Sequence, residues 1–242
     1  MPSNSPIKAV SFDGDGTLWD FEKVMRGGLR KVLDEFRRAL DDPRALAVGV
    51  DDLIRLRDEV AASVPGPEQN HERIRRASFV VLLERLGVSD ERLADRLAET
   101  YFTHRFGVIE LYDDTLATLA ALAGRYRVGL TSNGNNYPER FGLSDTFDFV
   151  VFSEECGFAK PDPRIYREAL RRGGSAPGEA VHVGNSLVND VQGAQGTGIH
   201  AVWLNRRGIA NDTTIQPDAV ISLERSNILG RRCIVVAKWM KG

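Results

Sequence analysis

Apolar residues recur at intervals of three and four along residues 22–105, which is the spacing of one buried face of an α-helix. The first series comprises Leu29, Val32, Leu33, Phe36 and Leu40. The later series are Ile74, Ser78, Val81, Leu82 and Leu86, followed by Leu93, Leu97 and Tyr101. Helix-breaking residues separate these segments at Asp41 to Pro43, at Pro65 to Pro67 and at Gly87. The pattern predicts a compact insert of about four helices without a strand.

Beyond Leu111 the pattern changes to short apolar runs that alternate with helical stretches. The runs expected to form strands are Arg127 to Ser132, Phe149 to Phe152, Ala180 to Val183, Ala201 to Leu204 and Ala219 to Ile221. Helices are expected at Pro163 to Arg172, at Asn189 to Gln195, and from a cap at Asp113 and Asp114 to Leu122. Alternation of this kind predicts an α/β fold with a mostly parallel sheet and helices on both faces.

The apolar run Ile7 to Val10 reads as a further strand of the same sheet, although the helical insert separates it from the later strands. The sheet therefore contains strands from the chain segments before and after the insert. We expect a sheet domain of residues 1–18 and 106–242, and a helical domain of residues 19–105 inserted into it.

Composition narrows the classes of function. The 242 residues are 42% hydrophobic and 27% charged, as in globular proteins, and the formal net charge is −2. This charge balance produces no general electrostatic field that would attract nucleic acid or an anionic membrane. No apolar stretch approaches the ~20 residues of a membrane span. The start from Met1 to Pro6 lacks the order of a signal peptide, and Cys156 and Cys233 are too few for a disulfide framework. We expect a cytoplasmic protein that binds neither nucleic acid nor membrane.

Two carboxylates, Asp13 and Asp15, follow the first apolar run within the sequence Asp-Gly-Asp-Gly-Thr. Carboxylates this close repel each other and favour a cation or a proton between them. Mg²⁺ commonly binds one or two carboxylates together with a substrate phosphate, so we hypothesise a Mg²⁺-assisted phosphoryl-transfer site. An EF-hand calcium loop does not fit, because it would need a metal ligand in place of Thr17 and a glycine in place of Leu18. A plain acidic turn stays open as an alternative.

Polar residues also follow the later strands. Ser132 to Gly134 offers a hydroxyl and backbone N–H groups, which suit either an anion cradle or a tight turn. Lys160 stands in a short loop before Pro163, which is suited to the first turn of a helix, although most lysines are solvated surface charges. The next strand is followed by two amides and a carboxylate, which are Asn185, Asn189 and Asp190. Such residues are also common as helix N-caps at this position.

These residues in this order resemble the haloacid dehalogenase-like hydrolase superfamily, across nearly the whole chain. The family's first motif, Asp-x-Asp-x-Thr after a strand, is matched by Asp13, Asp15 and Thr17. The second, a Ser or Thr at a strand end, is matched by Ser132, and the third, a lysine often followed by Pro-Asp-Pro, by Lys160. The fourth, often Gly-Asp-Ser-x-x-x-Asp followed by Gly-Ala, is matched by Gly184, Asp190, Gly193 and Ala194. Each motif alone is weak or moderate, and their order and strand contexts make the resemblance strong.

The resemblance implies a Rossmann-like core with an inserted α-helical cap of the C1 type, which is typical of the phosphatase-rich subfamily. It implies that Asp13 attacks phosphorus and forms an aspartyl-phosphate, while Asp15 protonates the leaving alkoxide and then activates water. It also implies that the substrate phosphate is bound by Thr17, Ser132, Asn133 and Lys160. The implied cofactor is Mg²⁺, and its ligands would be Asp13, the backbone carbonyl of Asp15, Asn185 and Asp190.

Asn185 departs from the family pattern, because phosphatases of the family usually carry an Asp there that binds Mg²⁺ directly. An amide oxygen still coordinates but brings no charge, so we expect weaker metal binding. A haloacid dehalogenase uses the same nucleophile without Mg²⁺ and would suit Asn185, but it has no need of a leaving-group acid such as Asp15. A binding role on a catalytically weakened site is a further alternative. We interpret the chain as a Mg²⁺-dependent phosphatase.

The expected substrate is a small phosphorylated metabolite, because a closing cap leaves little room for a macromolecule. Trp19 and Asp20, directly after the catalytic loop, are expected to shape the mouth of the pocket. The candidate substrate contacts in the cap are His71, Arg75 and Arg26. The alternative for each of them is an exposed position on a helix. The sequence carries no indication of an oligomeric state.

Overall fold

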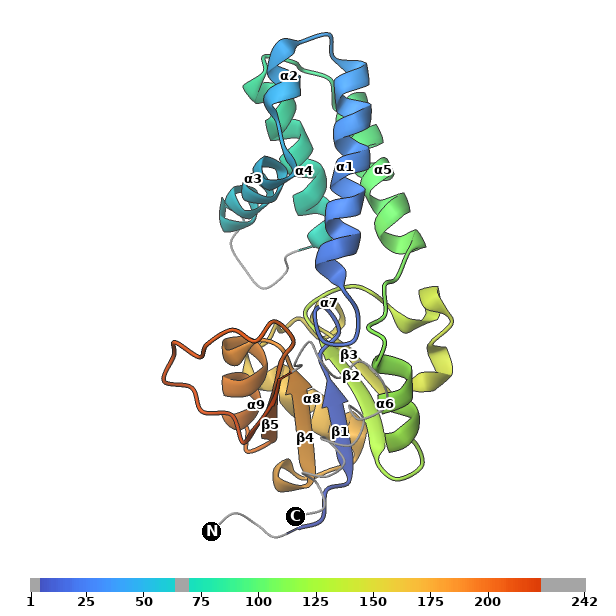
Figure 1. Cartoon of the computed structure of the whole chain (residues 1–242), viewed down its shortest axis with the longest axis vertical. Coiled ribbons are helices and arrows are strands. Elements are labelled where there is room, and N and C mark those ends of the chain that lie inside the picture. The colour runs from blue at the N-terminus through green and yellow to red at the C-terminus, as the bar shows by residue number, and fades with distance from the viewer. Residues whose placement is uncertain (1–4, 64–69, 223–242) are drawn as a thin grey trace. The chain divides into compact units, whose positions relative to one another are not determined.

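A computed structural model of the chain describes residues 5–63 and 70–222 (Figure 1). The turn expected at Pro65 to Pro67 and the second cysteine, Cys233, lie outside the described residues. The chain divides into two compact units, one formed by residues 1–20 with 111–242 and the other by residues 21–110. The helical domain was expected to comprise residues 19–105. The units differ from them at both ends because the helix before the second connection continues to Gly107 and because Trp19 forms β-bridges to Asp15 and Leu111.

In the part of the first unit that the structure describes, six strands form a sheet in the order β3-β2-β1-β4-β5-β6, in which every neighbouring pair is parallel. The strands are β1 (Ala9–Phe12), β2 (Arg127–Ser132), β3 (Phe149–Phe152), β4 (Ala180–Gly184), β5 (His200–Asn205) and β6 (Ala219–Ser222). The predicted Rossmann-like α/β fold is confirmed, and each expected strand is present. The first strand begins two residues later than the run Ile7 to Val10. Because β1 lies between β2 and β4, the residues after it lie between the ends of those two strands.

Helices flank the sheet within this unit, and they are α6 (Thr115–Leu122), α7 (Ser153–Cys156), α8 (Pro163–Gly173) and α9 (Gly193–Gln195). Short turns of 3₁₀-helix lie at Pro138–Phe141, Ser144–Thr146 and Pro177–Glu179. The helix expected at Asn189 to Gln195 is a turn of π-helix at Leu187–Gln192 that continues into α9. Pro163 lies in the first turn of α8, as expected, and the side chain of Asp162 caps this helix.

The expected cap at Asp114 is wrong in one respect. Asp114 occupies the N-cap position of α6, but its side chain makes no capping hydrogen bond. Its carboxylate instead accepts a 2.9 Å hydrogen bond from Nη2 of Arg206, whose guanidinium also donates to the carbonyl of Thr17. A charge-assisted pair with arginine is stronger than a bond to a neutral backbone N–H, which explains why the carboxylate is turned away from the helix end.

The described residues of the second unit form five helices, which are α1 (Phe21–Ala39), α2 (Pro43–Ala47), α3 (Val50–Ser63), α4 (His71–Arg85) and α5 (Glu91–Gly107). The predicted apolar faces form its core, in which Leu29, Val32 and Phe36 are fully buried. The side chains of Asp42, Asn70 and Asp90 cap α2, α4 and α5 by accepting backbone N–H bonds. Within the described residues of either unit, no helix has the length and apolar character needed to cross a membrane.

Candidate active site

The candidate residues lie where β1, β2 and β4 end. Asp13 directly follows β1, and its backbone N–H donates a 2.9 Å hydrogen bond to the carbonyl of Val183 in β4. Ser132 is the last residue of β2, and Gly184 is the last of β4. Parallel strands present their carboxyl ends at one edge of the sheet, which is where open α/β proteins bind ligands. The topology therefore brings three of the four sequence motifs together.

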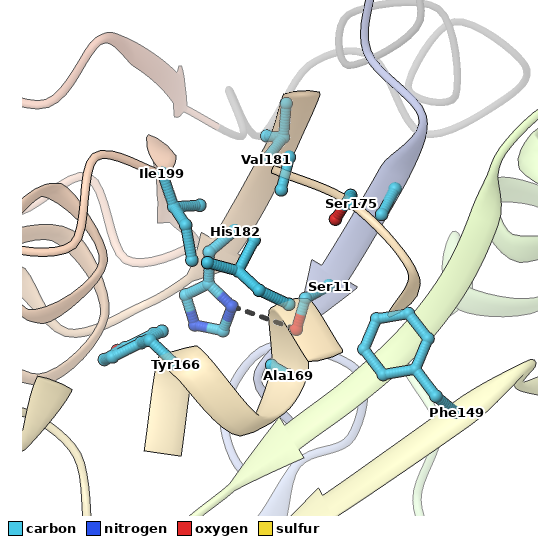
Figure 2. Close-up of a pocket in the computed structure, with 11 residues that line it drawn as sticks. Ser11, Phe149, Tyr166, Ala169, Ser175, Val181, His182 and Ile199 are labelled. Carbon is cyan, nitrogen blue, oxygen red and sulfur yellow. Dashed lines mark hydrogen bonds between the residues drawn. The ribbon is translucent and has the colours of Figure 1, made fainter. Parts of the chain in front are cut away.

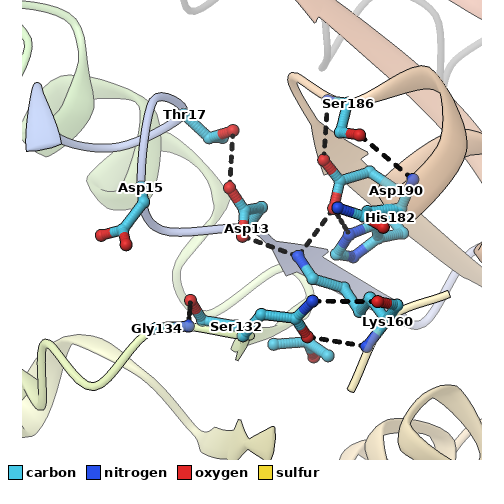
Figure 3. Close-up of polar contacts among 12 residues, drawn as sticks. Asp13, Asp15, Thr17, Ser132, Gly134, Lys160, His182, Ser186 and Asp190 are labelled. Carbon is cyan, nitrogen blue, oxygen red and sulfur yellow. Dashed lines mark hydrogen bonds and ion pairs between the residues drawn. The ribbon is translucent and has the colours of Figure 1, made fainter. Parts of the chain in front are cut away.

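The third motif joins them through its lysine side chain. The ammonium Nζ of Lys160 lies 2.6 Å from Oδ1 of Asp13 and 2.6 Å from Oδ1 of Asp190. Figure 3 shows Lys160 between the two carboxylates. All three residues are buried, with exposed fractions of 4% for Lys160, 6% for Asp13 and 1% for Asp190. A buried charge is tolerated only when it is paired and hydrogen-bonded, so these three residues form one interdependent charged cluster.

Burial and pairing give the two carboxylates different proton affinities. Burial raises the pKa of Asp13 above its ordinary value, and the charge of Lys160 only partly opposes this. Burial acts in the same direction on Asp190, but the charge of Lys160 and the bond from His182 outweigh it and hold the pKa of Asp190 well below its usual range. For Lys160 itself, the two carboxylates outweigh burial and raise the pKa. Lys160 and Asp190 are therefore an ion pair at neutral pH.

His182 is a member of the site that the sequence analysis missed. It lies in β4 and is fully buried, with Nε2 3.2 Å from Oδ1 of Asp190 and Nδ1 3.2 Å from the hydroxyl of Ser11. Ser11 in turn lies 2.7 Å from the hydroxyl of Thr131, which continues the chain of hydrogen bonds into β2. Burial lowers the pKa of His182 and favours the neutral ring. A signal was available, because a histidine interrupts the otherwise apolar run Ala180 to Val183.

A small cavity adjoins His182 on the side of β1 and β4 that α8 covers (Figure 2). Ser11, Phe149, Tyr166 and Ile199 are among the residues that line it, and its lining is almost wholly apolar. Its volume of about 10 Å³ is room for about one water molecule. The cavity is too small for a metabolite, so the candidate substrate position is at the strand ends rather than here.

Asp15 is held apart from the charged cluster. Figure 3 shows its carboxylate turned away from Lys160. Oδ1 of Asp15 accepts a 2.5 Å hydrogen bond from Nε1 of Trp19 and a 2.9 Å hydrogen bond from Nδ2 of Asn136. Trp19, which was expected at the pocket mouth, is 2% exposed and packs against Gly14 of its own loop, so a place at the mouth stays a prediction. Asn136 was not identified from the sequence, since it lies beyond the Ser132 to Gly134 motif.

Three further predicted residues lie at the site. The hydroxyl of Thr17 donates a 3.3 Å hydrogen bond to Oδ2 of Asp13, and the hydroxyl of Ser132 accepts one of 3.1 Å from the N–H of Gly134. The side chain of Asn133 makes two bonds to the main chain of Lys160, accepting from its N–H at 2.7 Å and donating to its carbonyl at 2.9 Å. Asn133 therefore fixes the loop that carries Lys160.

The carboxylate of Asp190 is almost fully occupied by donors. Oδ1 accepts from Lys160 and lies beside the His182 ring, and Oδ2 accepts a 2.8 Å hydrogen bond from the N–H of Ser186. A carboxylate has about four lone-pair sites, so one site of Asp190 is left for a further partner. Two of the sites of Asp13 are likewise left, because it accepts from Lys160 and Thr17.

The oxygen donors at this edge fit a hard cation such as Mg²⁺. They comprise the carboxylates of Asp13 and Asp190, the backbone carbonyl of Asp15 and the amide of Asn185. Asn185 is close to the loop that follows β1, since a methyl group added to Gly16 would lie 2.5 Å from its Nδ2. Across residues 5–63 and 70–222, no three side chains of His, Cys, Asp or Glu gather so as to hold a metal. A bound cation would therefore rely on amide, main-chain and substrate oxygens beside two carboxylates.

Two of the three candidate cap contacts have definite partners within the helical unit. Arg75 is buried rather than exposed, with Nη1 donating to the carbonyl of Leu53 and the guanidinium 4.8 Å from the centre of the Tyr101 ring. Arg26 forms ion pairs with Glu22 and Asp51. These partners give both arginines a structural task.

The family is defined by comparison with known proteins. A family model described as haloacid dehalogenase-like hydrolase matches residues 7–198, and the chain belongs to this family of hydrolytic enzymes. A glyceraldehyde 3-phosphate phosphatase of Methanopyrus kandleri is 32% identical over 207 residues, which cover 83% of this chain and 84% of the relative.

Two solved structures have the same fold over nearly their whole length. A 2-haloacid dehalogenase from Pseudomonas syringae pv. Tomato DC3000 has 33% identity and a TM-score of 0.75, covering 96% of this chain and 99% of that one. A HAD phosphatase from Thermococcus onnurineus has 28% identity and a TM-score of 0.64, covering 98% of this chain and 99% of that one. The relatives therefore include both reaction types that the sequence left in competition.

Proposed function

We propose that the protein is a Mg²⁺-dependent phosphatase of small phosphomonoesters that works through an aspartyl-phosphate on Asp13. The observation that carries this proposal is the pair of carboxylates on one loop in different surroundings. Asp13 is held against the ammonium group of Lys160, whereas Asp15 is held apart from it by Trp19 and Asn136. A phosphatase of this type needs one carboxylate as nucleophile and a second one as acid and base. Relatives named as phosphatases support the same conclusion.

In the first half-reaction, an oxygen of Asp13 attacks phosphorus and forms the acyl-phosphate bond. The ester P–O bond breaks, and the departing alkoxide takes a proton from the carboxyl group of Asp15. The ammonium group of Lys160 stabilises negative charge on the phosphoryl oxygens, and it already lies against the nucleophile. Asn133 contributes indirectly, because it fixes the main chain of Lys160.

In the second half-reaction, the carboxylate of Asp15 takes a proton from water, and the water oxygen attacks phosphorus. The bond between Asp13 and phosphorus breaks, which releases inorganic phosphate and regenerates both carboxyl groups in their starting forms. Ser132, the last residue of β2, and Thr17, in the loop that follows β1, would donate hydroxyl hydrogen bonds to phosphoryl oxygens. This role for Thr17 requires it to exchange its present partner, Asp13.

Mg²⁺ would be held by Asp13, the carbonyl of Asp15, Asn185 and Asp190. When bound, it would neutralise charge that otherwise repels an incoming phosphate dianion. The helical unit of residues 21–110 would serve as the cap, and such an insert favours a small phosphorylated metabolite over a macromolecule. The cytoplasmic location expected from the composition stays a prediction.

A dehalogenase is the second candidate, and two observations favour it. The solved dehalogenase has 33% identity to this chain, and Asn185 lacks the charge of the usual metal ligand. A dehalogenase, however, displaces halide, which needs no proton when it leaves. The two hydrogen bonds that orient Asp15 would then have no chemical purpose. The phosphatase accounts for both carboxylates.

The test is to assay the purified chain for phosphate release from glyceraldehyde 3-phosphate and a panel of phosphometabolites, and for halide release from 2-chloropropionate. Each assay is run with Mg²⁺ and with a chelator. We expect phosphate release that depends on Mg²⁺ and no halide release. Halide release without phosphate release would overturn the proposal in favour of the dehalogenase, and inactivity in both assays would favour a binding role.

A further inference from the structure

The acid and base of the proposed reaction sits on a loop beside the strand ends, where it needs a fixed orientation. We propose that Trp19 and Asn136 are positioning residues that hold Oδ1 of Asp15 and leave Oδ2 as the oxygen that gives and takes the proton. This inference rests on the proposed phosphatase function and adds two residues and one specific atom to it. Neither residue belongs to the sequence motifs described above.

Trp19 is fixed by its own packing. Its side chain is 2% exposed, and a methyl group added to Gly14 would lie 2.4 Å from the indole ring. The loop also closes on itself, because the N–H of Gly16 donates a 2.8 Å hydrogen bond to the carbonyl of Trp19. The indole therefore has little freedom to turn, and its N–H reaches Oδ1 of Asp15 at 2.5 Å.

Asn136 provides the second donor from a different segment of the chain. It lies between β2 and the short helix at Pro138–Phe141, and its side chain is 5% exposed. Its Nδ2 donates to the same Oδ1 of Asp15 at 2.9 Å. Two donors on one oxygen, anchored in two segments, define the direction of the carboxylate much better than one donor does.

Oδ2 is the oxygen left for chemistry. Among the described residues, no hydrogen bond to Oδ2 accompanies the two on Oδ1. The space beside Oδ2 is kept open by Gly134, where an added methyl group would lie 2.7 Å from that oxygen. Figure 3 shows Gly134 next to Ser132, whose hydroxyl accepts a hydrogen bond from the N–H of Gly134.

The arrangement also decides where the proton of the acid form resides. The two N–H donors use both lone pairs of Oδ1, so the protonated carboxyl group carries its hydrogen on Oδ2. Oδ2 then faces the leaving oxygen in the first half-reaction and the water molecule in the second. Removing a donor leaves the carboxylate of Asp15 chemically intact but free to rotate. The loss of orientation impairs proton transfer by Asp15 more than it impairs the attack by Asp13.

A comparison of leaving groups separates positioning from general damage. An alkyl phosphate needs a proton on its leaving oxygen, whereas 4-nitrophenyl phosphate releases a stabilised anion that needs little help. The value of kcat/KM reports the steps up to release of the alcohol, which is the acid-catalysed half. We measure it with glycerol 3-phosphate and 4-nitrophenyl phosphate for the wild type, Trp19→Phe and Asn136→Leu.

We expect each variant to lose about tenfold or more in kcat/KM on the alkyl ester and less than about threefold on the aryl ester. Combined with Asp15→Asn, neither change should reduce activity further, because the residue it positions is already inactive. Asn205→Leu is the matched control, since Asn205 is a buried amide in the same unit that bonds to Ile209. It removes comparable hydrogen bonds and should leave the ratio of the two substrates unchanged.

Equal losses on both esters, or losses that persist in the Asp15→Asn background, would overturn the positioning role. Far-ultraviolet circular dichroism and a thermal melt of each variant confirm that folded proteins are being compared. Failure of the proposed function is a different result. If the wild type releases no phosphate from either ester and beryllium fluoride does not attach to Asp13, the phosphatase proposal falls, and this inference falls with it.

Discussion

The two units of the chain bury charge in opposite ways. In the helical unit the buried charged side chains of the described residues are two arginines, Arg75 and Arg105, with no buried carboxylate beside them. In the sheet unit they are Lys160, Asp13 and Asp190, which form one paired cluster. Arginine carries a long apolar and planar side chain that packs on aromatic rings, whereas a buried lysine ammonium group requires anions.

The difference distinguishes charge buried for packing from charge buried for chemistry. The guanidinium of Arg105 lies 5.0 Å from the centre of the Phe21 ring and 4.8 Å from that of Phe106. Such contacts pack the guanidinium against aromatic rings and bring no carboxylate beside it. The carboxylates around Lys160 instead lie at the ends of strands, where a ligand has access to the sheet edge. A buried ion cluster is poor evidence for stability by itself, so its presence here points to function.

The largest expected effect is on turnover. Asp13→Asn should lower the rate of phosphate release by at least about a thousandfold, because the amide cannot form the acyl-phosphate. The fold should persist, since the amide oxygen can still accept the hydrogen bond of Lys160. Phosphate release is measured against wild type, with Asp51→Asn, an exposed acid of the helical unit, as control. Near-wild-type turnover in Asp13→Asn would refute the covalent mechanism.

The second effect is on stability and tests the cluster directly. Lys160→Met removes the cation and leaves Asp13 and Asp190 buried without their shared partner. We expect the free energy of unfolding to fall by about 3–5 kcal/mol at neutral pH. Denaturant titration measures the change. A loss below about 1 kcal/mol would mean that the carboxylates do not depend on Lys160.

The third prediction concerns the metal. Asn185→Asp restores a negative charge beside the proposed cation, and desolvation and crowding of the new carboxylate offset part of the gain. A net effect of about 1–3 kcal/mol corresponds to about a ten- to hundredfold lower Mg²⁺ concentration for half-maximal activity. The rise in melting temperature with added Mg²⁺ should shift in parallel, which gives a readout independent of turnover. Identical titrations of both proteins would remove Asn185 from the ligand set.

The fourth prediction belongs to the helical unit. Arg75→Met keeps an apolar side chain over Tyr101 and removes one hydrogen bond to the carbonyl of Leu53. We expect a loss of about 1–2 kcal/mol in the free energy of unfolding, clearly smaller than for Lys160→Met. Denaturant titration of the two variants under the same conditions decides it. A loss as large as that of Lys160→Met would contradict the difference between the two kinds of buried charge.

The smallest effect comes from an ion pair at the surface. Bonds from Arg171 and Arg172 lower the pKa of Glu168 from its ordinary value of 4.5 to about 2. A carboxyl group whose pKa is lower in the folded protein stabilises the fold above its unfolded pKa, and this contribution is lost as the pH falls from about 4.5 towards 2. Because solvent screens the pair, we expect Glu168→Gln to cost only about 0.5 kcal/mol at pH 7. Melting curves of both proteins should converge near pH 2, and a constant difference at all pH values would refute the pairing.

The elements of the fold could be read from the sequence, because each depends on a local pattern. The runs Arg127 to Ser132 and Phe149 to Phe152 form strands with the predicted bounds, since short apolar segments bury themselves in a parallel sheet. The helix at Pro163 ends one residue beyond its expected end, at Gly173. Asp114 was misjudged, because the arginine that draws its side chain away from the helix lies 92 residues further along the chain.

The sequence by itself determined the order of the motifs and the type of each reactive group, since both are properties of the chain. Only the tertiary structure decided which groups share a proton, a cation or an orientation. Lys160 meets Asp13 across 147 residues, and Asn136 meets Asp15 across 121. The tertiary structure likewise decided that the His182 ring is buried beside Asp190 and that Trp19 is buried. Such pairings depend on strand order, loop closure and desolvation, which act between distant segments and leave no local pattern in the chain.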